Sequence, residues 1–164
     1  MNADLHCHST VSDGQLAPAE VARRAHAHGV TLWALTDHDE IGGQLEARDA
    51  AQQLGMDYLS GVEISVTWAS RTVHIVGLHI DPACQTLIDG LERTRNGRAA
   101  RAEAMGEQLA SLGIPDTYEG ALKYVSNPDM ISRTHFARYL VDSGCCASTQ
   151  DAFTRYLGDG KPGY

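Results

Sequence analysis

The chain has 164 residues, 43% of them hydrophobic, and a formal net charge of −8. This length and apolar content suffice for one domain with a buried core and exclude wholesale disorder. The negative charge argues against a protein that binds the backbone of DNA or RNA in general. The net negative charge is concentrated in residues 1–84, which hold 4 Arg or Lys and 11 Asp or Glu, whereas residues 85–164 hold 9 and 10. We therefore expect a cation site in the first half and anion-binding arginines in the second.

The first half alternates between strand and helix patterns. The predicted order is strand, helix, strand, helix, strand, strand, over residues 3–8, 17–29, 30–39, 42–55, 56–66 and 71–81. Pro18 in the first turn of the first helix and Gly29 just after its end are typical helix boundaries. This alternation predicts an α/β fold with a mostly parallel sheet.

The pattern changes after Pro82, and only helical segments follow. A long amphipathic helix is predicted first and three shorter ones after it, over residues 85–113, 117–125, 132–144 and 148–158. We expect residues 84–157 to form a helical insertion or cap on the α/β domain that residues 1–83 begin. The turn-rich residues 158–164 are expected to lead back towards that domain.

The four cysteines, Cys7, Cys84, Cys145 and Cys146, show neither CxxC spacing nor the density of a disulfide scaffold. Free thiols in a reducing compartment fit this pattern. The N-terminus has no basic segment followed by an apolar run, so no signal peptide is expected. No stretch approaches the length of a transmembrane helix. We therefore expect a cytoplasmic protein.

The segment DLHCHSTVSDG contains a histidine pair. Side chains two positions apart on a strand point to the same face, so His6 and His8 are expected to converge while Cys7 faces away. Paired imidazoles are good ligands for Zn, Mn or Fe. Taken alone, the pair is explained more simply as two histidines on a half-exposed strand. Cys7 is expected to be packed rather than reactive, because nothing nearby marks its thiol as activated.

Three later strands also deliver a histidine or an acid. His38 lies among acidic residues at the end of the second predicted strand, and the carboxyl ends of strands carry the site in parallel α/β folds. Glu63 lies inside an apolar strand, where a lone carboxylate is costly unless it is paired or binds a cation. His74 follows in the fourth strand, and His79, five residues later, is expected to face the other side. This convergence predicts a metal site.

Two acids flank His38 in the segment LTDHDEIGG. We expect Asp37 and Asp39 to orient imidazole ligands through hydrogen bonds. The arginine-rich run ERTRNGRAAR is interpreted mainly as a solvated helix face and only secondarily as an anion-binding surface.

The segments DLHCHSTVSDG, LTDHDEIGG, GVEIS and VHIVGLHID together resemble, in order and spacing, the first four motifs of the PHP family, named for polymerase and histidinol phosphatase. The segments ISRTHFARYLVDSG and YLGDGKPGY look like the helical insertion of its TrpH/YciV-type branch. The resemblance implies a distorted (β/α)7 barrel, incomplete in this chain, with an all-helical insertion. The family pattern also uses a later His and an Asp-x-His pair as ligands, and no such motif follows His135.

The resemblance further implies a cluster of two or three divalent metal ions, expected to be Mn, with Zn or Fe as alternatives. Mixed imidazole and carboxylate ligands suit these ions better than Mg or Ca. By motif position, His6 and His8 would bind one metal, and Glu63 would bridge two. His74 would bind the second metal, and Asp13 and His38 would hold a third. Glu63, Asp13 and His38 are expected to be the catalytic residues.

The activity implied by the resemblance is metal-dependent hydrolysis of phosphomonoesters by metal-activated water. The expected substrates are 3',5'-nucleotide bisphosphates or the 5' ends of short oligonucleotides. Arg133 and His135 are expected to bind the substrate phosphate, because a guanidinium can contact phosphate oxygens bidentately. The partner is thus a small phosphorylated molecule, without general nucleic-acid binding or membrane binding, and no protein partner is indicated.

Other functions stay open at this point. The missing later ligands favour a non-catalytic PHP-like module that binds metal for structure or regulation. A histidinol-phosphate-type phosphatase is a variant with a different substrate. An amidohydrolase-type enzyme also has HxH strands but usually needs a lysine as metal bridge. The only lysines, Lys123 and Lys161, lie in the helical half, so this possibility ranks last.

Overall fold

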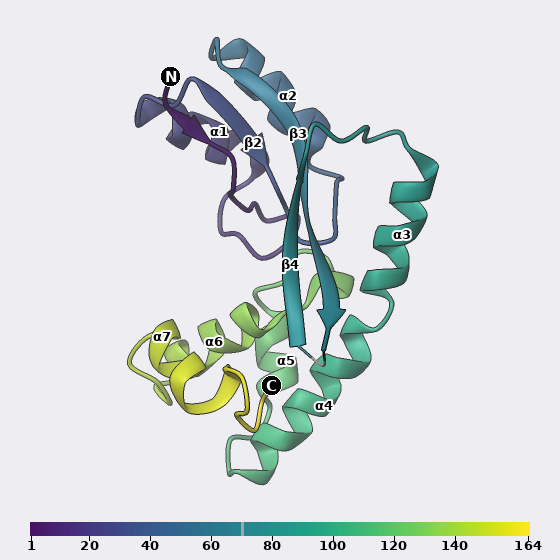
Figure 1. Cartoon of the computed structure of the whole chain (residues 1–164). Helices are drawn as coiled ribbons and strands as arrows, with labels where there is room; N and C mark the ends of the chain where they lie inside the picture. Colours follow the sequence, from purple (N-terminus) through teal and green to yellow (C-terminus); the bar gives the residue numbers. More distant parts are fainter. Residues whose placement is uncertain (70) are drawn as a thin grey trace. The chain divides into compact units, whose positions relative to one another are not determined.

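The computed structural model describes residues 1–69 and 71–164 (Figure 1). The chain divides into two compact units, Met1–Arg95 and Asn96–Tyr164. Helix α3 (Gln85–Arg95) belongs to the first unit. The predicted extents of a helical insertion (84–157) and of a returning segment (158–164) stay predictions.

The first unit is built on a four-stranded sheet with the order β1–β2–β3–β4. Its strands are β1 (Ala3–Asp4), β2 (Leu32–Leu35), β3 (Asp57–Trp68) and β4 (Arg71–Leu78). The first three strands run parallel, and β4 pairs antiparallel with β3. Two helices, α1 (Pro18–Ala27) and α2 (Gln44–Gln53), form the crossovers between the parallel strands (Figure 1). The predicted α/β class with a mostly parallel sheet is confirmed.

Local sequence explains where these helices begin and end. Pro18 occupies the start of α1, and the Glu20 carboxylate accepts a hydrogen bond from the Ala17 backbone N–H at 3.1 Å. Gly29 and Gly55 follow α1 and α2 with φ of 78° and 73°, a left-handed conformation that glycine adopts without steric cost. Each helix therefore ends where the chain must turn back to the sheet.

Strand β2 lies at the centre of the first core. Trp33, Ala34 and Leu35 are fully buried, as expected for a strand covered on both faces. The Gln44 side chain joins β2 to β3: its amide N–H groups donate to the carbonyls of Leu35 and Gly61 at 3.0 and 2.8 Å. Its carbonyl accepts the Gly61 N–H at 3.2 Å, so this buried amide is fully used where β2 ends.

The second unit is helical. Its elements are α4 (Arg98–Ser111), α5 (Thr117–Leu122), the 3₁₀ turn η1 (Pro128–Met130), α6 (Arg133–Asp142), α7 (Thr149–Ala152) and the π-helix η2 (Phe153–Leu157). They enclose a separate core with Leu109, Phe136, Leu140 and Leu157 fully buried. Within the described part of the chain, no helix combines the length and apolar character needed to cross a membrane.

Two predicted boundaries are wrong. The single helix expected over residues 85–113 is two helices, because α3 ends at Arg95 and α4 begins after Gly97. Asn and Gly are poor helix formers, and this pair interrupts an otherwise continuous amphipathic pattern. The strand expected over residues 3–8 is only β1, Ala3–Asp4. Beyond it, the Cys7 N–H donates to the Thr36 hydroxyl at 3.2 Å instead of continuing the regular ladder.

Gly120 in α5 lies directly against α6. A Cβ built at Gly120 would overlap the ring of Tyr139, whereas a Cβ at Gly90 in α3 would meet only the Arg93 guanidinium at 3.9 Å. We expect Gly120→Ala to lower the free energy of unfolding by about 1–3 kcal/mol through overpacking. Gly90→Ala adds the same methyl group at an open position, and it should raise the free energy of unfolding by up to about 1 kcal/mol through helix propensity. Urea unfolding followed by circular dichroism measures both, and equal effects would contradict the packing argument.

Candidate metal centre

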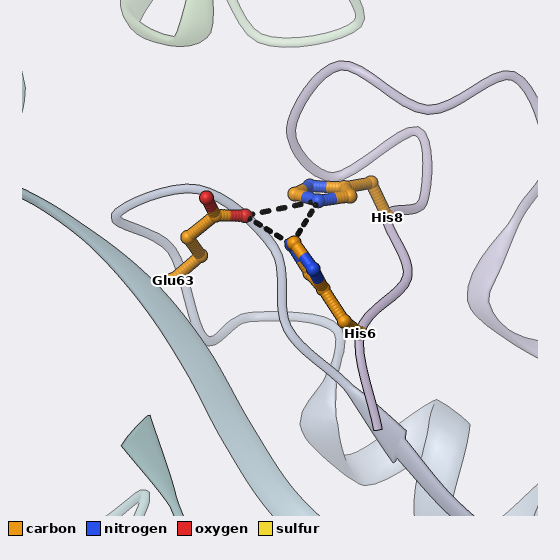
Figure 2. Close-up of side chains that lie close together, drawn as sticks. All are labelled: His6, His8 and Glu63. Carbon is orange, nitrogen blue, oxygen red and sulfur yellow. Dashed lines mark hydrogen bonds and ion pairs between the residues drawn. The ribbon is translucent and has the colours of Figure 1, made fainter. Parts of the chain in front are cut away.

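Four imidazoles surround the Glu63 carboxylate. Its Oε2 lies 2.7 Å from His6 Nε2, 3.0 Å from His8 Nε2 and 3.8 Å from His38 Nδ1. Its Oε1 lies 3.4 Å from His74 Nδ1. Figure 2 shows His6 and His8 pointing at the same carboxylate oxygen, with their own Nε2 atoms 3.2 Å apart. The four histidines predicted as metal ligands therefore meet at one acid.

The backbone around Glu63 fixes the position of its side chain. The Glu63 N–H donates to the Asp37 carbonyl at 3.1 Å, and the Glu63 carbonyl accepts the Asp39 N–H at 2.8 Å. His38, between these two acids, thus forms a parallel bridge with Glu63 beyond the end of β2. Asp39 has a φ of 49°, and its carboxylate accepts the Ser65 N–H at 2.7 Å. The loop after β2 is therefore held against β3 on both sides of Glu63.

His74 reaches the cluster from the antiparallel strand β4. It pairs with Ser65, and Ser65 lies two residues from Glu63 on the same face of β3. His74 and Glu63 are thus diagonal neighbours across the hairpin. His79 lies after the end of β4 with a φ of 57°, and it belongs to none of the candidate ligand groups among the described residues.

Asp13 approaches the cluster from the loop after the histidine pair. Its Oδ1 lies 3.5 Å from His8 Nδ1, and its Oδ2 lies 3.9 Å from His38 Nε2. Gly14 lets the loop return this closely, because a Cβ at Gly14 would overlap the His8 carbonyl. The segment therefore delivers three candidate ligands within eight residues.

The six side chains form three overlapping groups in which the ligand atoms lie within 4.8 Å of one another. The groups are His6, His8 and Glu63; His8, Asp13 and His38; and His38, Glu63 and His74. Ligand atoms about 2 Å from one metal ion are separated by about 3 Å, which matches the contacts in the first group. Two buried ring nitrogens, His8 Nδ1 and His38 Nδ1, have no hydrogen-bond partner among the described residues. The donor set therefore fits divalent cations.

The electrostatics of the site also suit metal binding. Burial lowers the pKa of His38 to about 4, although the nearby Asp13 carboxylate acts in the opposite direction. His38 is therefore neutral at pH 7, the form in which imidazole binds a metal. Only 7% of the Glu63 side chain and 14% of the Asp13 side chain are exposed, so both carboxylates face the imidazoles with little solvent screening.

Asp37 holds the loop between the ligands and makes no described hydrogen bond to an imidazole. Its carboxylate accepts hydrogen bonds from the Ser9 N–H at 2.7 Å, the Ser9 hydroxyl at 2.7 Å and the Ser12 hydroxyl at 2.6 Å. Burial raises the pKa of Asp37, and these hydrogen bonds act against that shift. The prediction that Asp37 orients imidazoles is thus corrected: it orients Ser9 and Ser12, which the sequence analysis did not single out.

Arg95 contacts the loop that carries His38, although the sequence did not indicate it as a residue of the site. Its Nη1 donates to the Asp39 carbonyl at 2.6 Å and lies 3.4 Å from the Glu40 carboxylate. The interpretation of the arginine-rich run as a solvated face is therefore wrong for Arg95, whose side chain is only 18% exposed. No local pattern distinguishes Arg95 from its neighbours, because the contact joins residues 56 positions apart.

Cys7 is packed away from the cluster. Its thiol donates to the Ala34 carbonyl at 3.3 Å and accepts a hydrogen bond from the Trp33 indole at 3.1 Å. Burial raises the pKa of Cys7 to about 12, so the thiol stays protonated. All four cysteines are free, and the expectation of an unreactive, packed Cys7 agrees with this geometry.

Arg133 and His135 lie in the second unit, at the start of α6. The Arg133 Nη1 donates to the Leu157 carbonyl at 3.2 Å, and its guanidinium lies 4.7 Å from the centre of the Tyr164 ring. His135 is buried, and its Nδ1 accepts the Ser132 N–H at 3.0 Å as part of the helix cap. Their predicted role in binding phosphate stays a prediction.

Comparison with known proteins is consistent with this geometry. A sequence model of the PHP domain matches residues 4–96. The chain is 53% identical over 163 residues to a 3',5'-nucleoside bisphosphate phosphatase of Chromobacterium violaceum, covering 99% of this chain and 57% of the relative. It is 45% identical over 161 residues to a 5'-3' exoribonuclease of Haemophilus influenzae, covering 98% and 58%.

A solved structure also matches. The crystal structure of a candidate metal-dependent phosphoesterase from Bifidobacterium adolescentis superposes with a TM-score of 0.90 at 30% identity, covering 99% of this chain and 57% of that one. The chain thus spans slightly more than half the length of these proteins. The resemblance noted from its four histidine and acid motifs is confirmed, and the chain belongs to the PHP domain family.

Proposed function

We propose that the chain serves a metal-dependent phosphoesterase that hydrolyses phosphomonoesters of 3',5'-nucleotide bisphosphates or of the 5' ends of short oligonucleotides. The observation that carries the proposal is the cluster of four imidazoles around the buried Glu63 carboxylate, with Asp13 beside it. The two relatives named above support the choice of substrate, because one is named a nucleoside bisphosphate phosphatase and the other an exoribonuclease.

The six clustered side chains would hold two or three divalent ions. Manganese is the proposed metal, with zinc or iron as alternatives, because four imidazoles and two carboxylates suit these ions better than magnesium or calcium. Bound metals would lower the pKa of water and neutralise charge on the phosphoryl group. Glu63 belongs to two of the three ligand groups and is therefore the proposed bridging ligand. Asp13 and His38 belong, with His8, to the third group.

The second unit is proposed to supply the groups that bind the substrate phosphate. Arg133 carries a permanent charge at the start of α6, and its Nη1 already donates to a carbonyl oxygen, so its donors suit an oxygen-rich ligand. His135 lies two residues later in the same helix turn. Both residues are proposed to act on the substrate and not on the metals.

We expect Glu63→Gln to reduce kcat/KM by at least about 100-fold. Loss of an outer partner of a metal ligand already costs about 10–100-fold, and Glu63 itself is a proposed ligand. Phosphate release from adenosine 3',5'-bisphosphate is measured with added Mn and with EDTA, on this chain and on the longest natural protein that contains it. The control Glu92→Gln changes an exposed glutamate of α3 and should keep wild-type activity.

Full turnover in Glu63→Gln would contradict the assignment of the site. Activity only in the longer protein would support the proposal and indicate that residues outside this chain complete the site. Absence of phosphate release from both proteins, with metal still bound, would instead favour a non-catalytic metal-binding module.

Added Mn should stabilise the chain, because the metal binds the folded cluster and not the dispersed ligands. At a free Mn concentration about 100 times the dissociation constant, the free energy of unfolding is expected to rise by about 2.7 kcal/mol. The substitution His8→Ala should reduce this gain, since His8 belongs to two of the three ligand groups. Thermal unfolding with Mn and with EDTA measures the effect, and an equal gain in His8→Ala would contradict the proposed ligand set.

A further inference from the structure

A buried triangle of hydrogen bonds is formed by residues next in sequence to three of the candidate metal ligands. It consists of Asp37, Ser9 and Ser12, and all three residues are at most 2% exposed. The Asp37 carboxylate accepts hydrogen bonds from both serine hydroxyls and from the Ser9 N–H, at 2.6 to 2.7 Å. Hydrogen bonds that include a charged group are stronger than neutral ones, so the triangle is a rigid element of the fold.

Each corner of the triangle is the immediate chain neighbour of a different metal-ligand candidate. Ser9 follows His8, Ser12 precedes Asp13, and Asp37 precedes His38. These three neighbours are the members of one candidate ligand group, His8, Asp13 and His38. The arrangement of the triangle thus sets the separation of three backbone positions from which those ligands project.

Two other candidate ligands, Glu63 and His74, do not need such a support. Glu63 and His74 lie inside the paired strands β3 and β4, where ladder hydrogen bonds fix the backbone on both sides. Asp13 instead lies in a loop between β1 and α1, and the loop residues around it are held by Asp37. We therefore expect loss of the triangle to lower the metal affinity of some ligand groups more than that of others.

We propose that Asp37, Ser9 and Ser12 are positioning residues that set the affinity of the His8–Asp13–His38 group for its metal ion, with much less influence on the group His38–Glu63–His74. This inference rests on the proposed metal-dependent function. The three residues act through the ligands next to them and do not contact the metal or substrate themselves.

The test is a titration of the chain with Mn(II), followed by the electron paramagnetic resonance signal of the free ion. The reference variant is Asp13→Asn. It removes a proposed ligand, so the class of Mn site whose affinity it lowers is the class that includes Asp13. Ser12→Ala should weaken that same class by about 10–100-fold, the range typical for outer partners of metal ligands, and leave the remaining class unchanged. Ser9→Ala, which retains the hydrogen bond from its own N–H, should weaken the same class by a smaller factor.

A double-mutant comparison separates positioning from general destabilisation. If Ser12 acts through its neighbour Asp13, then Ser12→Ala should have no further effect in the Asp13→Asn background. The control Thr117→Val removes a buried hydroxyl from the second unit that has no hydrogen-bond partner among the described residues, and it should leave all Mn affinities unchanged. Circular dichroism of each variant reports whether it is folded.

Unchanged Mn binding in Ser12→Ala, equal weakening of every class, or a further loss in the Asp13→Asn background would each overturn the inference. A wild-type chain with a single class of Mn site would overturn it as well. The readout is metal binding, so the expected selective weakening in this chain, together with no phosphate release from either this chain or the longer protein, would contradict the proposed function and still support the positioning role.

Discussion

The structure depends on the burial of one carboxylate among four imidazoles. Glu63 is 5% exposed, and an isolated charge in such a place would be costly unless a cation or hydrogen bonds compensated it. Its backbone is bonded to Asp37 on one side and to Asp39 on the other, which fixes the point from which the side chain projects. A divalent cation would satisfy the acid and the inward-facing ring nitrogens together.

Two kinds of strand connection, helical crossovers and a hairpin, produce this arrangement. Parallel strands joined by helices bring the ends of β1 and β2 to the same edge as Glu63, which places His6, His8 and His38 there. The hairpin from β3 to β4 then adds His74 on the same face. Ligands in paired strands are fixed by the ladder, whereas ligands in the connecting segments are fixed by side-chain contacts.

Those side-chain contacts link the site to the rest of the first unit. Arg95, the last residue of α3, donates to the carbonyl of Asp39, and Asp39 in turn contacts β3 at the Glu63 carbonyl and the Ser65 N–H. Gln44, at the start of α2, ties the end of β2 to Gly61, two residues before Glu63. Residues of α2 and α3 thus contact the backbone next to the candidate ligands, and such partners commonly tune metal affinity.

The sequence alone predicted the α/β class, and strand positions with an isolated acid in an apolar strand pointed to four histidines and Glu63. Asp13 was expected only from the resemblance to the PHP family. The sequence placed His74 in the site and His79 outside it through the two-residue period of a strand. It did not reveal the helix break at Gly97, since amphipathicity continues across it, nor the roles of Ser9, Ser12 and Arg95. Those contacts join residues 25 to 56 positions apart, and only the tertiary structure decides which distant polar groups meet.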